Sequence, residues 1–148
     1  MNIAEVSRMI IESFKNVETT EASDNIFFLY ASERHLPFAT LVVSDVNDTA
    51  SGLERLGVFR LNIGVKRATY QNLFGPQPRF AKDGGIIDTG HDYTALDKLM
   101  PHPVYAPVSW VCIVSPSAET FEKVVLPLLQ EAYEQDVMKH DKQEARDR

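Results

Sequence analysis

The 148-residue chain lacks several features that mark common functional classes. It has a single cysteine, Cys112, which excludes an intramolecular disulfide and favours a reducing compartment. No apolar run approaches the roughly 18 residues that a membrane-spanning helix needs. The first residues carry Glu5, Arg8 and Glu12 within their apolar pattern, which is untypical of a signal peptide. We therefore expect a soluble cytoplasmic protein with no membrane partner.

Positive charge is also in the minority. The chain has 15 Lys and Arg against 21 Asp and Glu, and its net charge of −6 disfavours a general nucleic-acid or anionic-membrane binder. It contains no H-E-x-x-H pattern, no G-x-S-x-G elbow and no phosphate-binding glycine loop. No motif therefore names a reaction, and we assign neither a cofactor nor a metal site from the sequence.

The clearest pattern present is the alternation over residues 58–65, which predicts a β-strand. One face of this strand carries Phe59, Leu61, Ile63 and Val65, and the other carries Val58, Arg60, Asn62 and Gly64. We expect the first set to face the core and the second to face solvent or a cleft. A long charged side chain in mid-strand, such as that of Arg60, is held more rigidly than one on a loop.

The remaining patterns predict further helices and strands. Helices are expected over 2–15, over 66–74, after Asp92 up to Pro101, and from 117 onward with a kink or break at Pro127. Strands are expected over 26–31, 38–43 and 108–114, with a connection at 16–25 and a turn at 32–37.

This order predicts an α+β fold. Its mainly antiparallel sheet has about four to five strands, with the N-terminal and C-terminal helices packed on one face and two short helices inserted. We expect a single domain over residues 1–136 and a charged, flexible tail over 137–148.

The leading functional hypothesis is a non-enzymatic binding domain for a small anionic or planar molecule. Its concave surface would combine the outer face of the strand at 58–65, the long loop at 76–91 and the proline-rich approach to the only tryptophan. The candidate ligand-binding residues are Arg60, Asn62, Lys66, His91, His102, Tyr105 and Trp110. Lysine and arginine would supply charge, and the aromatic side chains an apolar wall.

Three other readings remain open. Residues 54–82 hold six basic residues against one acidic residue, a pattern that also suits nucleic-acid binding. His91 and His102, with Asp88 or Asp92, would suit acid–base or metal-assisted catalysis. The apolar content is also compatible with a homodimer.

Cys112 lies in an apolar run and is expected to be a buried structural thiol.

Several sequence blocks resemble a known family. The blocks F-F-L-Y, L-G-V-F-R-L-N-I-G-V, L-M-P-H-P-V-Y and W-V-C-I-V-S-P are similar to a family of uncharacterised bacterial proteins of this length, over residues 26–133. The order of elements also resembles the MmcQ/YjbR-like proteins, with Trp110 and Tyr133 at matching positions. That second resemblance implies a fold, and a double-wing surface proposed to bind DNA.

Overall fold

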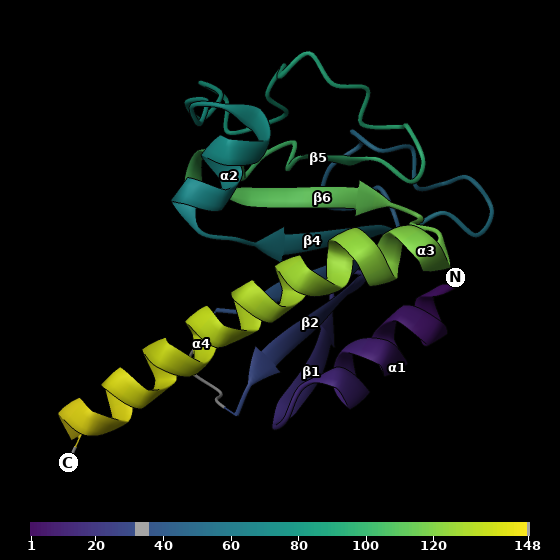
Figure 1. Ribbon diagram of the computed structural model, residues 1–148. Coiled ribbons are helices and arrows are strands. Elements are labelled where there is room, and N and C mark those ends of the chain that lie inside the picture. The colour runs from purple at the N-terminus through teal and green to yellow at the C-terminus, as the bar shows by residue number, and fades with distance from the viewer. Residues whose placement is uncertain (32–35, 148) are drawn as a thin grey trace.

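A six-stranded antiparallel sheet forms the centre of the protein (Figure 1). The structure is a computed structural model that describes residues 1–31 and 36–147. The strands are β1 (Val17–Ala22), β2 (Asn25–Tyr30), β3 (Ala39–Val42), β4 (Arg60–Gly64), β5 (Leu99–Pro101) and β6 (Trp110–Val114), in the order β1-β2-β3-β4-β6-β5. This architecture confirms the α+β class, with slightly more strands than expected.

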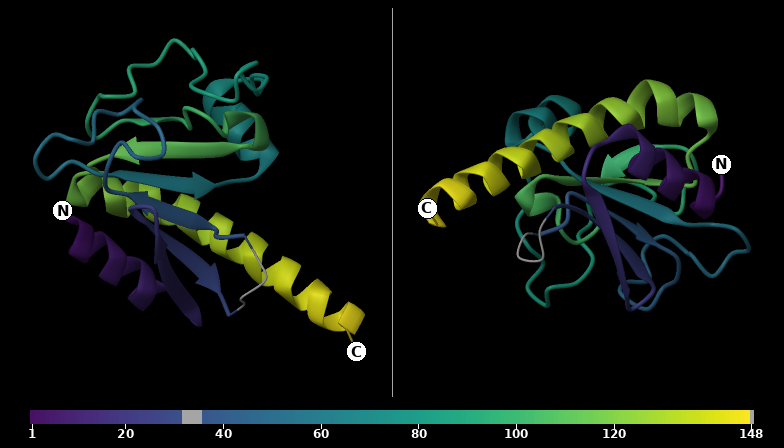
Figure 2. Two further views of the ribbon diagram at one scale, coloured as in Figure 1. Left: turned by 180° about the vertical axis from the view of Figure 1, so that it is seen from behind. Right: turned by 90° about the horizontal axis from the view of Figure 1, so that it is seen from below.

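Helices cover one face of the sheet, and loops lie on the other. The helices are α1 (Ile3–Ser13), α2 (Arg67–Phe74), α3 (Ala118–Thr120) and α4 (Leu126–Asp147), with a 3-10 turn η1 (Ala106–Val108) and a π-helical turn η2 (Phe121–Val125). The right view of Figure 2 shows α1 and α4 on the same side of the sheet. Leu61 and Ile63 of β4 pack there with Ile10 of α1 and Leu129 of α4 in the main core. Among the described residues, no helix is both long and apolar enough to cross a membrane.

The alternation predicted for 58–65 is confirmed. Leu61 and Ile63 are buried on the helix side, and residues 60, 62 and 64 point to the loop side. The register across the sheet places Asn62 directly between Thr40 of β3 and Cys112 of β6. The loop-side face of the sheet is therefore polar at its centre.

The connection predicted at 16–25 is wrong, because β1 occupies most of it. All six residues of β1 pair with β2, through a tight turn in which Ser23 and Asp24 adopt positive φ values of 51° and 59°. None of the β1 side chains is buried, so the strand carries no burial pattern. Main-chain pairing alone defines it, and hydrophobic periodicity could not reveal it. Residues 32–35 of the expected turn lie outside the described residues.

The short helix predicted after Asp92 is also wrong. The Asp92 carboxylate accepts hydrogen bonds from the Thr94 amide and hydroxyl, which forms a local turn in place of a helix cap. Asp97 then takes a positive φ of 59°, and the chain enters the edge strand β5. Pro101 is tolerated there because an edge strand leaves one side of its backbone unpaired.

The C-terminal helical region begins where the sequence indicates. The Ser117 hydroxyl accepts a hydrogen bond from the Thr120 amide, as an N-cap should. The helix does not break at Pro127, and the π-helical turn η2 lies directly before α4, near the proline. Helix α4 is continuous through residues 137–147, where most side chains are exposed. The boundary at 136 and the flexibility of the tail stay predictions.

Candidate functional site

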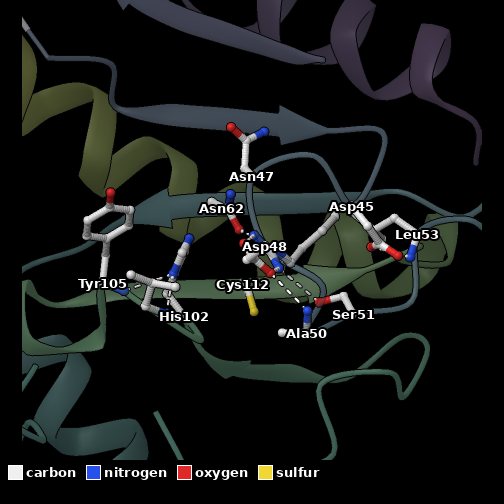
Figure 3. Close-up of polar contacts among 12 residues, drawn as sticks. Asp45, Asn47, Asp48, Ala50, Ser51, Leu53, Asn62, His102, Tyr105 and Cys112 are labelled. Atoms are coloured by element: carbon white, nitrogen blue, oxygen red, sulfur yellow. Dashed lines mark hydrogen bonds and ion pairs between the residues drawn. The ribbon is translucent and has the colours of Figure 1, made fainter. Parts of the chain in front are cut away.

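A buried polar network lies at the centre of the loop-side face (Figure 3). The Arg60 guanidinium donates to both oxygens of Asp48, from Nη1 at 2.9 Å and from Nη2 at 2.7 Å. Arg60 Nη1 also donates to Ser51 Oγ, and Nε donates to Asn62 Oδ1 at 3.0 Å. Asn62 Nδ2 then donates to Thr40 Oγ1 at 2.9 Å. All three guanidinium nitrogens therefore donate hydrogen bonds inside the protein.

The loop between β3 and β4 carries the partner of Arg60. It is held in a compact shape by Asp45, whose carboxylate accepts from the Leu53 amide, and by Asp48, which accepts from the Ala50 amide. Burial alone would raise the pKa of Asp48, but the hydrogen bonds and charge of Arg60 outweigh it and hold the pKa below its usual range. Arg60 is only 1% exposed beneath this loop.

His102 is a neutral structural residue. Its Nδ1 accepts hydrogen bonds from the Val104 and Tyr105 amides, both at 3.0 Å, so its proton belongs on Nε2. Burial, and then the nearby charge of Arg60, lower the pKa of His102 to about 3. A general base needs a pKa near the working pH, and the pKa of His102 lies far below neutral pH.

Cys112 is buried, as predicted. Its Sγ donates to the Pro101 carbonyl at 3.5 Å, which fixes the thiol between β5 and β6. Burial raises the pKa of Cys112 to about 12, although the charge of Arg60 opposes this shift. The thiolate needed for nucleophilic or metal chemistry is therefore absent at neutral pH.

His91 lies apart from this network, on the exposed loop before β5. Its Nδ1 lies 3.0 Å from Thr89 Oγ1, and its ring meets Phe74 edge-on with centroids 5.5 Å apart. None of these contacts is shared with His102. Over the described ranges, no group of three or more His, Cys, Asp or Glu side chains could hold a metal ion.

A groove of about 440 Å³ lies at the end of the sheet where β4 ends and β6 begins, beside α4. Trp110 and Gly64 are register partners in these strands, and both line it. A Cβ placed on Gly64 would lie 2.9 Å from Cε2 of the Trp110 indole, so the indole lies directly over the glycine. The volume is within the range typical of small-molecule sites.

Basic side chains surround this groove. Lys66 and Arg67 follow β4, Lys139 comes from α4, and all three are exposed. Within the part of the chain that the structure describes, no carboxylate forms an ion pair with any of them. The Asp136 carboxylate also lines the groove and accepts from the Tyr30 amide. The lining residues therefore carry an excess of positive charge on an acidic protein.

Glu131 of α4 fixes the start of α2 next to the groove. Its two oxygens accept from the Lys66 amide at 2.9 Å and from Thr69 Oγ1 at 2.6 Å. The carboxylate thereby supplies the cap that the side chain of Lys66 does not. This contact orients the backbone from which Lys66 and Arg67 project.

Removing this cap should destabilise the protein modestly. We expect Glu131→Ala to lower the free energy of unfolding by about 1 kcal/mol, because an N-terminal helix ligand is lost. Urea denaturation measures this change. Glu134→Ala is the matched control, since that exposed carboxylate accepts from Gln130 of its own helix, and it should change stability by less than about 0.5 kcal/mol. Equal effects of the two variants would contradict the capping role.

The structure thus divides the seven candidate residues. Arg60, Asn62 and His102 lie on the buried loop-side face, and Lys66 and Trp110 line the groove. Tyr105 is 52% exposed and lies outside the groove, with its ring tilted by 51° against that of His102, and His91 joins neither group.

The seven candidate residues did not include Asp48, Arg67 and Lys139. A signal existed for Asp48, because an arginine on a half-buried strand requires a carboxylate partner and the acidic loop before this strand offers several. Arg67 directly follows a candidate that was named. Lys139 was assigned to the tail, so only the path of α4 beside the sheet could place it at the groove.

Comparison with known proteins gives one match. The model of a family of unknown function (DUF6194) matches residues 1–145, so the chain belongs to that family. No curated protein and no solved structure matches the chain significantly. The resemblance to uncharacterised proteins is thereby confirmed, and the resemblance to MmcQ/YjbR-like proteins is not.

Proposed function

We propose that this member of a family of unknown function binds a small anionic molecule in the groove beside Trp110. The observation that carries the proposal is the set of three side-chain cations, Lys66, Arg67 and Lys139, that line this groove without a carboxylate partner among the described residues. Unpaired cations around a groove attract and orient an anion, and they remain hydrated until it arrives.

The proposal moves the site away from Arg60. The positive charge of Arg60 is matched by Asp48 and is buried, so neither is available to a ligand. We assign Arg60, Asn62 and His102 to the support of the sheet, and Lys66 and Trp110 to the ligand. Arg67 and Lys139 take the charge-supplying role that the sequence interpretation gave to Arg60.

The only tryptophan of the chain lies in the groove, so its fluorescence reports on this site alone. We expect a saturable change in emission on titration with at least one of inorganic phosphate, citrate or adenosine 5′-monophosphate. A double variant, Lys66→Ala with Arg67→Ala, should weaken the binding by about 10-fold or more, since each cation contributes charge-assisted hydrogen bonds.

The matched control neutralises two exposed basic residues outside the groove, Arg8→Ala with Lys98→Ala, and so makes the same change in net charge. It should leave the affinity within about twofold of the unmodified protein. No saturable change with any of the three anions up to about 10 mM would contradict the proposal, because weaker binding is not specific recognition.

The structure gives less support to nucleic-acid binding through residues 54–82. Arg55 is committed to the carbonyls of Ser51, Gly52 and Thr94, and Arg60 to Asp48. Four basic residues remain in this segment, too few to set it apart from the acidic surface around it. A DNA oligonucleotide in the same titration tests this alternative, through an affinity that falls steeply with salt.

A further inference from the structure

The glycine beneath Trp110 is explained by the indole and not by the backbone. Gly64 is not among the glycines with positive φ, and its amide donates to the Phe38 carbonyl in ordinary sheet fashion. Its carbonyl accepts from Gln135 Nε2 at 3.2 Å. Glycine weakens a strand, so its presence within β4 calls for a close neighbour. That neighbour is the indole, with Cε2, Cζ2 and Nε1 all within 3.3 Å of the position that a Cβ would take.

The indole is set into the sheet on one side but is not covered. Trp110 is only half-buried, and it lines the groove together with two exposed apolar side chains, Val108 at 55% and Leu36 at 83%. An indole that served the core alone would be enclosed by apolar neighbours. Here Trp110 is only partly enclosed, and it lines the same groove as the three cations.

We infer that the ligand carries a planar aromatic ring that stacks on Trp110, with its negative charge directed to Lys66, Arg67 and Lys139. This inference rests on the proposed function and adds the shape of the ligand to its charge. Gly64 is the positioning residue, because the absence of a side chain there lets the indole lie low enough to leave room for a second ring. A flat ring on an indole gains stacking energy that a sugar or an aliphatic acid does not.

Matched pairs of probes separate the ring from the charge. Adenosine 5′-monophosphate is compared with ribose 5-phosphate, and benzoate with cyclohexanecarboxylate. The members of each pair share their anionic group, but only the first has a planar aromatic ring. We expect the aromatic member of at least one pair to bind about 10-fold more tightly than its non-aromatic partner. The pair that shows the difference tells whether the anion is a phosphate or a carboxylate. Adenosine, which has the ring without the charge, should bind more weakly than its monophosphate.

Variants then assign the preference to the indole. An added Cβ in Gly64→Ala would lie too close to the indole and displace it. We expect this to shift the emission of the free protein and to weaken the binding of the aromatic ligand by about 10-fold. The same variant should change the affinity for the non-aromatic partner by less than about threefold. The double variant at Lys66 and Arg67 should instead weaken both members of each pair.

Circular dichroism checks that Gly64→Ala folds. If Gly64→Ala does not fold, Trp110→Leu replaces it, because leucine keeps an apolar side chain without an aromatic ring. Calorimetric titration then measures the binding, since this variant has no tryptophan fluorescence. Equal affinity for the aromatic and non-aromatic anions would overturn this inference, while the anion-binding function stands. Binding of none of the charged probes would overturn the function itself, and the inference with it.

Discussion

Asp48→Ala is expected to lower the free energy of unfolding by about 3–5 kcal/mol, one of the two largest effects that the structure predicts. The substitution leaves the Arg60 guanidinium, 1% exposed, without its counter-charge and without two of its hydrogen bonds. Arg60 cannot escape this cost by losing its proton, since a guanidinium stays protonated in proteins at neutral pH. Urea denaturation at neutral pH measures the loss.

The matched control is Asp88→Ala, which removes an exposed carboxylate that accepts from the Gly90 amide in a local turn. It should cost less than about 1 kcal/mol. A double-mutant cycle with Arg60→Met isolates the pair from its surroundings and should give a coupling energy of about 2 kcal/mol or more. A loss below about 1 kcal/mol for Asp48→Ala would show that the loop between β3 and β4 is not held by this ion pair.

The position of Arg60 shows how far sequence reasoning extends. Alternation along 58–65 depends only on the two-residue period of a strand, so the face of each residue could be read directly. What covers that face depends on a loop whose anchor, Asp48, lies 12 residues from Arg60 along the chain. An arginine that faces a cleft and an arginine beneath a loop have the same local pattern.

The elements that were missed share a different cause. The β1 strand, V-E-T-T-E-A, buries none of its side chains, and its evidence is the hydrogen-bond ladder with β2. The segment after Asp92 has an apolar pattern that suits a short helix, but edge pairing with β6 competes with it and wins. Periodicity reports burial, and it fails where main-chain pairing decides the structure.

Two of the candidate residues, Lys66 and Trp110, line the groove. Lys66 was named as a source of charge within the basic segment 54–82, and Trp110 because it follows a proline-rich segment and could line a pocket. The pairing of Gly64 with Trp110 requires the register of β4 against β6, which a single sequence does not fix. The groove therefore follows from the fold and not from a motif.

His102 should make the stability of the protein depend strongly on pH in mild acid. In the unfolded chain its pKa is near the ordinary value of 6.5, and in the folded protein burial lowers it to about 3. Between these values the unfolded chain binds more protons than the folded protein, so the free energy of unfolding rises with pH through this window. It is level above the window, where His102 is neutral in both states.

The size of the effect follows from the shift. The His102 contribution should lower the free energy of unfolding by about 2 kcal/mol between pH 7 and pH 5, and by about 4 kcal/mol near pH 3.5. Urea denaturation at a series of pH values measures it. The interval from pH 7 to pH 5 is the informative one, because Asp48 contributes little to the pH dependence there. The stability that Asp48 gains from its pairing with Arg60 is lost only as the pH falls through its ordinary pKa of 3.8 and below.

His102→Asn tests the assignment, because its side-chain oxygen can still accept from the Val104 and Tyr105 amides while the side chain no longer titrates. The variant should lose most of the slope between pH 7 and pH 5, and the exposed control His91→Asn should keep it. A slope that survives in His102→Asn would mean that another group titrates in this interval. Its loss would show that the folded protein keeps His102 neutral beside a buried ion pair.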